Sequence, residues 1–212
     1  MNDKQWYKLV SEIGSCRICQ SEPNAVAEKG SSPIFTRLNP AQTDILFIGE
    51  SPGYEETFAS GKKYISINSR SDPTGRFLYK LLTQILGLEE KDFCYTNSVL
   101  CLPKFKANAY PVSSQQILNC SPHLKRIILE LSPKIVCTLG ITPLNAINRI
   151  EKHGINDLHS AVAKKVNWFN RILFPLFSTS LKSRFGADGR NKDKQIEDWT
   201  KLKQLYIDLY KN

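Results

Sequence analysis

Short apolar runs alternate with stretches of helical periodicity along this 212-residue chain. The predicted strands cover Asp44 to Gly49, Phe93 to Val99, Lys134 to Leu139 and Arg171 to Phe177. The predicted helices cover Asp3 to Ile13, Thr74 to Leu86, a segment that begins at Ser113, Thr142 to Ile150 and Lys192 to Tyr210. Apolar strands that alternate with helices form a parallel sheet with helices on both faces. The sequence therefore predicts an α/β fold with three layers, α/β/α, around a central four-stranded parallel sheet.

The helix that begins at Ser113 carries two local signals. Gln116 completes a capping box with Ser113, which fixes the start of the helix. Ser121-Pro122 predicts a break or a restart, because proline suits the first turn of a helix and damages its interior.

Three of the predicted strands end in residues that suit a ligand site. In this architecture ligands bind where loops leave the carboxyl ends of the strands. The first strand leads into Gly49-Glu50-Ser51-Pro52-Gly53, a tight turn that brings backbone N–H groups and a carboxylate to the sheet edge. Asn97 ends the second strand and offers both a donor and an acceptor. Ser178-Thr179-Ser180 follows the last strand, and its hydroxyls suit either phosphate binding or helix capping.

Four cysteines have the spacing of a soft-metal site. They are Cys16 and Cys19, which form a C-x2-C pair, and the distant Cys101 and Cys120. Four thiolates hold either tetrahedral zinc or an iron-sulfur cluster, and such a site would fasten the N-terminal segment to the middle of the chain. In the alternative interpretation the C-x2-C pair is a redox dithiol and the other two are buried apolar residues. Cys94 and Cys137 lie inside predicted strands, where a small apolar side chain packs well.

Composition limits the class of protein. With 41% hydrophobic residues, the chain can bury one substantial core, so we expect a single domain spanning residues 1–212 and a monomer. No apolar run approaches a membrane span, and the first residues do not form a secretory signal, so we expect a cytoplasmic protein. The net charge is +9, and residues 160–212 hold 11 Lys or Arg against 5 Asp or Glu. This imbalance fits a polyanionic partner as well as a basic solubilising surface.

Taken in order, these motifs resemble those of the family 4, iron-sulfur uracil-DNA glycosylases. That family has an early C-x2-C, then G-E-A-P-G, G-[RK]-P-F, T-N-x-x-K-C-R-P, a cysteine that opens a helix, and L-x-P-K-x-[IV]-x-x-L-G. The chain has C-R-I-C at 16–19, G-E-S-P-G at 49–53, G-K-K-Y at 61–64, T-N-S-V-L-C-L-P at 96–103, Cys120, and L-S-P-K-I-V-C-T-L-G at 131–140. The order of the cysteines, motifs and strands agrees over nearly the whole chain.

The resemblance implies a uracil-DNA glycosylase-like fold and a set of functional residues. Glu50 would lie near the sugar C1′, Tyr64 would stack on the flipped base, and Asn97 would read the base edge, with Gly49, Ser51 and Gly53 completing the base site. The four cysteines would hold a 4Fe-4S cluster, with zinc as the minor alternative. DNA would be bound by Ser180, Lys182, Arg184 and Arg190.

Two departures from the family bear on the substrate. The family has H-P-S after the last strand, where this chain has Ser178-Thr179-Ser180, so Ser178 joins the catalytic candidates in place of a histidine. The polar stretch from Ile65 to Thr74 is longer than the corresponding link in the family. We expect a monofunctional DNA glycosylase that flips out uracil or a damaged or modified pyrimidine and leaves an abasic site. The alternatives are a glycosylase for a bulky hypermodified base, as in antiviral defence against phage DNA, a catalytically weak DNA-binding homologue, and a zinc-stapled enzyme unrelated to DNA.

Overall fold

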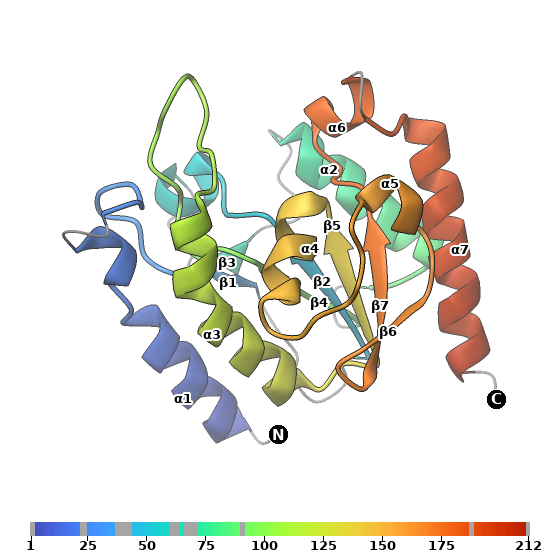
Figure 1. Cartoon of the computed structure of the whole chain (residues 1–212), viewed down its shortest axis with the longest axis horizontal. Helices are drawn as coiled ribbons and strands as arrows, with labels where there is room; N and C mark the ends of the chain where they lie inside the picture. The colour runs from blue at the N-terminus through green and yellow to red at the C-terminus, as the bar shows by residue number, and fades with distance from the viewer. Residues whose placement is uncertain are drawn as a thin grey trace.

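A five-stranded sheet forms the centre of the molecule (Figure 1). The structure is a computed structural model that describes residues 3–21, 25–36, 44–59, 64–65, 72–89, 92–186 and 189–210. The sheet contains β2 (Ile45–Gly49), β4 (Cys94–Asn97), β5 (Ile135–Leu139), β6 (Val166–Trp168) and β7 (Arg171–Leu176), in the spatial order β4-β2-β5-β7-β6. Strands β4, β2, β5 and β7 are parallel, as predicted, and every residue of β2 and β5 is buried.

The predicted count of four strands is wrong, because β6 adds an antiparallel edge strand. It pairs with β7 through a two-residue turn in which Phe169 and Asn170 have φ values of 49° and 56°. A turn with two positive φ values matches the right-handed twist of a hairpin. A strand of three residues is too short for its alternation to be recognised in the sequence.

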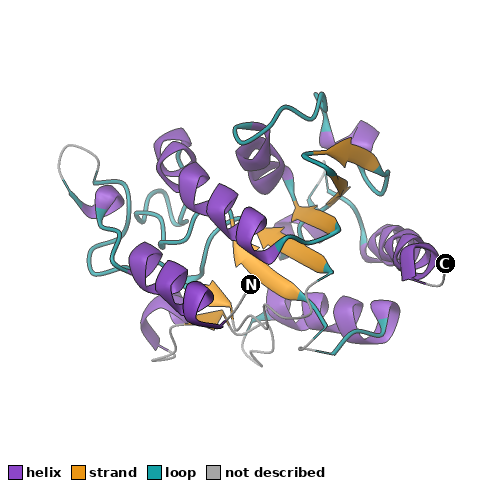
Figure 2. Ribbon diagram, turned by 90° about the horizontal axis from the view of Figure 1, so that it is seen from below, coloured by secondary structure: helices purple, strands orange, loops and turns teal. Residues whose placement is uncertain are grey.

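Helices cover both faces of the sheet (Figures 1 and 2). They are α1 (Asp3–Gly14), α2 (Pro73–Lys80), α3 (Ser114–Leu131), α4 (Ile141–Asn148), α5 (Leu158–Ala161), α6 (Leu181–Phe185) and α7 (Lys192–Tyr210). One short 3-10 helix, η1 (Ile18–Gln20), two π-helices, η3 (Glu55–Ala59) and η4 (Leu81–Leu86), and a two-stranded parallel sheet of β1 (Phe35–Thr36) and β3 (Tyr64–Ile65) complete the described elements. The predicted helix over residues 74–86 is therefore α2 continued by η4.

Aromatic packing joins the sheet to the C-terminal helix. The ring of Phe47 in β2 stacks on Trp199 of α7, with centroids 5.4 Å apart and an interplanar angle of 7°. The Phe93 ring packs edge-on against the Phe47 ring, with centroids 6.0 Å apart. Phe47 and Trp199 are almost completely buried, so this contact anchors α7 to one face of the sheet.

The predicted break at Pro122 does not occur. α3 runs through Pro122 without interruption, and the capping box of Ser113 and Gln116 is present as predicted. A proline inside a helix leaves the carbonyl four residues earlier without its donor. That residue is Leu118, which is 51% exposed, so water can hydrate its carbonyl. Packing of the buried face of α3 therefore outweighs the local preference of proline.

Among the described residues, no helix is long and apolar enough to span a membrane.

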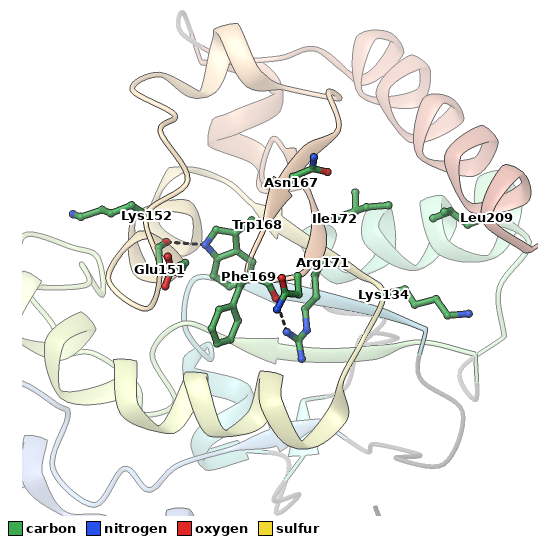
Figure 3. Close-up of a pocket in the computed structure, with 10 residues that line it drawn as sticks. Lys134, Glu151, Lys152, Asn167, Trp168, Phe169, Arg171, Ile172 and Leu209 are labelled. Carbon is green, nitrogen blue, oxygen red and sulfur yellow. Dashed lines mark hydrogen bonds between the residues drawn. The ribbon is translucent and has the colours of Figure 1, made fainter.

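An open pocket of about 710 Å³ lies at the turn between β6 and β7 (Figure 3). Trp168, Phe169 and Arg171 line it, and the Trp168 indole N–H donates to the carbonyl of Glu151 at 2.7 Å. The pocket faces the amino-terminal ends of β5 and β7, which is the edge opposite to the predicted ligand site.

Candidate active site and cysteine cluster

The turn after β2 is held against the turn after β4 by backbone hydrogen bonds. The N–H of Ser98 donates to the carbonyl of Gly49 at 2.8 Å, and the N–H of Val99 donates to the carbonyl of Glu50 at 3.0 Å. The Ser98 hydroxyl also donates to the Glu50 carbonyl, at 2.8 Å. The backbone of Glu50 is therefore fixed, while its side chain remains exposed to solvent.

A threonine that sequence reasoning missed orients the Glu50 carboxylate. Thr142, in the first turn of α4, donates from Oγ1 to Glu50 Oε2 at 3.0 Å. The bond joins the loops that follow β2 and β5, 92 residues apart in the sequence. A lone threonine after a strand carries no signal in the sequence, because the contact depends on β2 and β5 being neighbours.

Asn97 and Tyr95 lie directly against Gly49. A Cβ atom placed on Gly49 would overlap the Tyr95 hydroxyl and would lie 2.5 Å from Asn97 Oδ1. The parallel register explains this approach, since Gly49 pairs with Asn97 across the sheet. Asn97 is 2% exposed, and its Oδ1 has no hydrogen-bond partner among the described residues. Because a buried acceptor without a partner is costly, this oxygen is suited to a ligand that supplies an N–H group.

The surroundings of this pair are acidic. Burial raises the pKa of the Tyr95 phenol, and the nearby carboxylates of Glu56, Asp72 and Glu50 raise it further. Burial also raises the pKa of Glu56, although the N–H of Gly53 opposes this by donating to its carboxylate at 2.8 Å. The carboxylates near the Tyr95 phenol give this region a negative potential, which would stabilise a cationic group in the site.

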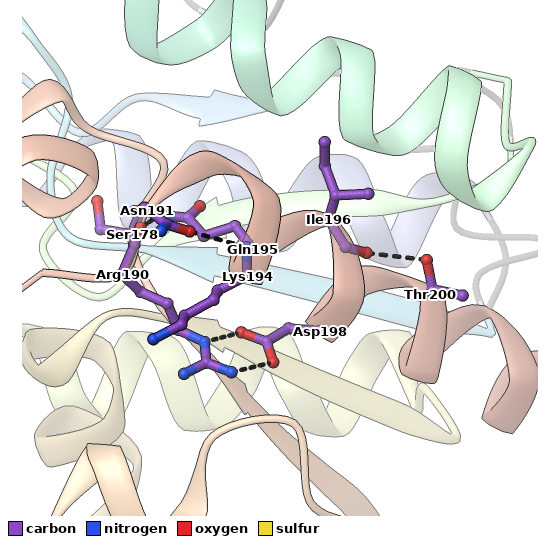
Figure 4. A network of polar contacts seen from close by, with 8 residues as sticks. All are labelled: Ser178, Arg190, Asn191, Lys194, Gln195, Ile196, Asp198 and Thr200. Carbon is purple, nitrogen blue, oxygen red and sulfur yellow. Dashed lines mark hydrogen bonds and ion pairs between the residues drawn. The ribbon is translucent and has the colours of Figure 1, made fainter.

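Ser178 lies at the same edge of the sheet, after β7. The Ser178 Cβ would lie 3.3 Å from a Cβ placed on Gly140, which follows β5 and has a φ of +105°. Gln195 of α7 donates from Nε2 to the carbonyl of Ser178 at 3.2 Å and to that of Arg190 at 2.8 Å (Figure 4). α7 therefore fixes the segment that carries Ser178.

The predicted DNA-binding residues have different surroundings. The Arg190 guanidinium binds the buried carboxylate of Asp198 through two hydrogen bonds (Figure 4), so this charge is already engaged. Arg184 lies over the Phe77 ring at 4.8 Å and donates to the Pro73 carbonyl at 3.3 Å. Lys182 is exposed.

The remaining predicted residues are three of the base site, Ser51, Gly53 and Tyr64, and one of the DNA-binding surface, Ser180. Ser51 and Gly53 belong to the turn between β2 and η3, next to Glu50. Ser180 caps α6, and its hydroxyl accepts from the N–H of Ser183 at 3.2 Å. Of the two predicted roles for this hydroxyl, phosphate binding and helix capping, the structure shows capping. Tyr64 pairs with Phe35 through the backbone of β3, and its side chain lies outside the described part of the structure. Most of the polar stretch after it, residues 66–71, also lies outside that part.

The four predicted ligand cysteines lie near one another. Asn119 of α3 donates from Nδ2 to Cys19 Sγ at 3.3 Å, which brings the C-x2-C segment to the helix that carries Cys120. Burial raises the pKa of Cys101 to about 12, with further contributions from Cys120, Cys19 and Cys16. Burial likewise raises the pKa of Cys120 to about 12. As the side chains stand, the described residues contain no group of three His, Cys, Asp or Glu arranged around a single metal ion.

Comparisons with known proteins agree with the motif order. The family profile described as "Uracil DNA glycosylase superfamily" matches residues 35–203. The chain belongs to the uracil-DNA glycosylase superfamily. It is 34% identical over 131 residues to the Type-4 uracil-DNA glycosylase of Saccharolobus solfataricus and 32% identical over 136 residues to that of Sulfurisphaera tokodaii. These alignments cover 62% and 63% of this chain and 52% and 53% of the relatives, so the chain spans about half the length of the curated relatives it matches.

Membership of the superfamily confirms the predicted resemblance. The matched region contains every predicted site residue from Glu50 to Arg190, and it excludes Cys16 and Cys19, which precede it. The role of the C-x2-C pair stays a prediction, which rests on its spacing and on the contact of Cys19 with Asn119 of α3.

Proposed function

We propose that this chain is a DNA glycosylase that hydrolyses the N-glycosidic bond of uracil, or of a related pyrimidine, and leaves an abasic site. The observation that carries the proposal is the buried Oδ1 of Asn97, which has no hydrogen-bond partner among the described residues and lies against Gly49, the residue before Glu50. Uracil presents an imide N–H that such an acceptor can bind, whereas cytosine presents a bare ring nitrogen there. A base enters such a site only after it has left the stack.

Glu50 would act on the sugar side of the bond. Cleavage of an N-glycosidic bond builds positive charge on the sugar and negative charge on the departing base. The Glu50 carboxylate, held by Thr142, can stabilise the sugar cation and orient a water molecule for attack. Water would serve as the nucleophile, so the enzyme would be monofunctional; Lys62 and Lys63, the alternative nucleophiles next to Tyr64, lie outside the described residues.

The departing base would be handled by the strand ends around Asn97. Asn97 Oδ1 would accept a hydrogen bond from the imide N–H. Ser178 stands where the family has its histidine, so a hydroxyl would replace an imidazole as the donor to the base. A hydroxyl is a smaller donor than a ring, which leaves room for a larger base. Tyr64 would supply the stacking face that offsets part of the cost of flipping the base.

The proposal is tested with oligonucleotides that carry uracil, other damaged bases and bulky modified pyrimidines, scored for abasic sites. Glu50→Gln keeps the shape of the side chain and removes its charge, so we expect abasic-site formation to fall by about 100-fold or more with DNA binding retained. Glu12→Gln is the matched control, because Glu12 lies on α1 in an exposed ion pair with Arg126. Full activity of Glu50→Gln would overturn the mechanism, and an inactive wild type on every base would overturn the function.

We also propose that Cys16, Cys19, Cys101 and Cys120 hold a 4Fe-4S cluster, which would supply a structural link between the N-terminal segment and α3. The donor set fits, since it consists of four thiols from three segments, and Cys19 and Cys101 pack together in a small buried cluster of their own. A metal centre supplies the positive charge that makes such thiols release their protons. Asn119 donates to Cys19 Sγ, as expected of a side chain that positions a ligand.

Iron, sulfide and zinc are measured in protein purified without oxygen. We expect about four iron atoms per chain and a broad visible absorption that Cys101→Ser abolishes. Cys94→Ala is the matched control: Cys94 is buried inside β4, away from the four thiols, and its loss leaves the iron content unchanged. Colourless protein with one zinc per chain would refute the cluster and support the zinc alternative.

A further inference from the structure

Four aromatic side chains form a continuous series on the surface beside the candidate active site. The ring of Phe58 lies 5.2 Å from that of Tyr54, Tyr54 lies 6.2 Å from Tyr110, and Tyr110 lies 5.1 Å from Phe105. We call these four residues the aromatic ladder. Tyr54, Phe58 and Phe105 are 52%, 40% and 54% exposed, so three of the rings present apolar faces to solvent. Contiguous exposed apolar side chains of this kind mark an interaction surface.

The ladder begins at the active-site turn. Tyr54 follows Gly53 directly, so the ladder starts four residues from Glu50. Phe105 and Tyr110 belong to the long loop between β4 and α3, which rises beside η3 in Figure 1. The contact between Tyr54 and Tyr110 joins these two segments. A strand bound in the active site would therefore meet the ladder as it leaves.

Backbone contacts hold the long loop in place. The N–H of Lys104 donates to the carbonyl of Val26 at 3.1 Å, and the N–H of Phe105 donates to the Glu28 carboxylate at 3.0 Å. Beyond them, Lys106 and Ala109 pair through both of their backbone bonds across a tight turn. The rings of Phe105 and Tyr110, which flank this pair, are thus presented by a fixed scaffold, and binding would not have to order the loop.

The charges around the ladder are positive at its Phe105 end, whereas Glu55 and Glu56 follow Tyr54 in the sequence at the other end. Lys104 and Lys106 flank Phe105 and are exposed. Lys29 is exposed and precedes Gly30. A Cβ atom placed on Gly30 would lie 3.9 Å from the Phe58 ring. The neighbouring acidic side chain, Glu28, is engaged by the N–H of Phe105. Exposed rings interleaved with lysines are the chemistry that binds an unpaired nucleic-acid strand, because bases stack on the rings while ammonium groups meet phosphates.

We propose that the aromatic ladder binds unpaired nucleotides of single-stranded DNA that flank the base in the active site. The inference rests on the proposed function for the identity of the nucleic acid. Duplex DNA keeps its bases stacked on one another, so it cannot use the ring faces. The ladder therefore gives the protein a preference for single-stranded over duplex DNA.

The test measures the affinity of the protein for a fluorescent oligothymidylate that lacks uracil and for the matching duplex. We expect Phe105→Ala and the double variant Phe105→Ala/Tyr110→Ala to weaken binding of the single strand by about 10-fold or more. Their affinity for the duplex should change by less than about 2-fold. Tyr7→Ala is the matched control, since Tyr7 is 68% exposed on α1 and lies outside the ladder.

Two further variants separate stacking from charge. Phe105→Trp keeps a ring and should bind the single strand at least as tightly as the wild type. Lys106→Gln should weaken binding and reduce its salt dependence by about one counterion. Unchanged single-strand affinity in the double variant, equal losses for single strand and duplex, or a wild type that does not bind the oligothymidylate would each overturn the proposal.

The same experiment distinguishes this proposal from the proposed function. If the wild-type protein excises no base, but Phe105→Ala weakens its binding of the single strand, the glycosylase proposal is refuted and the ladder proposal is supported. A wild type that excises uracil while all ladder variants bind the single strand normally would refute the ladder and leave the glycosylase intact.

Discussion

Replacing Gly49 with alanine tests the geometry of the candidate site more directly than any change of a polar residue. The φ angle of Gly49 is not in the left-handed region, so its backbone tolerates a side chain, and the constraint is spatial. A methyl group at this position would overlap the Tyr95 hydroxyl and come within 2.5 Å of Asn97 Oδ1. Both neighbours are held in β4, so either strand or side chain must shift to admit the methyl.

The expected cost follows from this overlap. Adding a methyl group to a closely packed interior costs about 1 to 3 kcal/mol in the free energy of unfolding. For a chain of this size that lowers Tm by roughly 2 to 12 °C. Because Asn97 would move from the base site, we also expect excision to fall by about 100-fold, the order of loss that a misplacement of about 1 Å produces.

The assay compares Gly49→Ala with two other glycine replacements, by thermal unfolding and by abasic-site formation. A Cβ on Gly53 would meet only Glu56 Oε2 at 3.6 Å, an ordinary contact, so Gly53→Ala should change the free energy of unfolding by less than about 0.5 kcal/mol. Gly14, at the end of α1, has no atom within 4 Å of its Cβ position and should tolerate alanine in both assays. If Gly49→Ala proves as stable and as active as Gly14→Ala, the close approach of β2 and β4 described above is wrong.

Three further predictions concern charges. Asp198→Ala removes the buried partner of Arg190 and should lower the free energy of unfolding by about 3 to 5 kcal/mol, measured by chemical denaturation. Asp193→Ala is the control, because Asp193 is exposed at the start of α7 and should tolerate alanine. Equal effects of the two substitutions would contradict the buried pair. Burial raises the pKa of the Glu56 carboxyl, so its charged form opposes folding at pH values above that raised pKa. Glu56→Gln should therefore raise Tm at pH 8, and this gain should disappear as the pH falls below 4.5, the ordinary pKa of the group. A gain of the same size at pH 8 and below pH 4.5 would refute the assignment. Lys182→Glu should weaken DNA binding and lower its salt slope by about two charges, because the exposed lysine becomes an acid; an unchanged slope would remove Lys182 from the DNA-binding surface.

Features set by neighbouring residues could be read from the sequence. The capping box at Ser113 fixed the start of α3, since both of its bonds lie within four residues. The apolar run of β2 predicted a buried parallel strand, and Glu50 and Asn97 followed from their positions at strand ends. The spacing of the cysteines predicted a shared site for Cys16, Cys19, Cys101 and Cys120; the structure packs Cys19 with Cys101, and the metal site stays a prediction.

Tertiary packing decided the features that join distant segments. Pro122 remains inside α3 because the buried face of that helix outweighs a local preference, and β6 exists because β7 offers it an edge. The bond from Thr142 to Glu50 depends on β5 lying beside β2.

The sequence by itself thus determined the β-α alternation, the strand-end residues and the four cysteines, whose signals span a few positions each. Only the tertiary structure decided that Tyr95 and Asn97 press against Gly49, that Asp198 engages Arg190, and that the rings of Tyr54 and Tyr110 meet. The physical reason is that each of these contacts is created by the order of strands in the sheet or by the docking of a helix or loop. Neither the order of the strands nor the docking of a helix or loop produces a pattern in the sequence of the residues that come into contact.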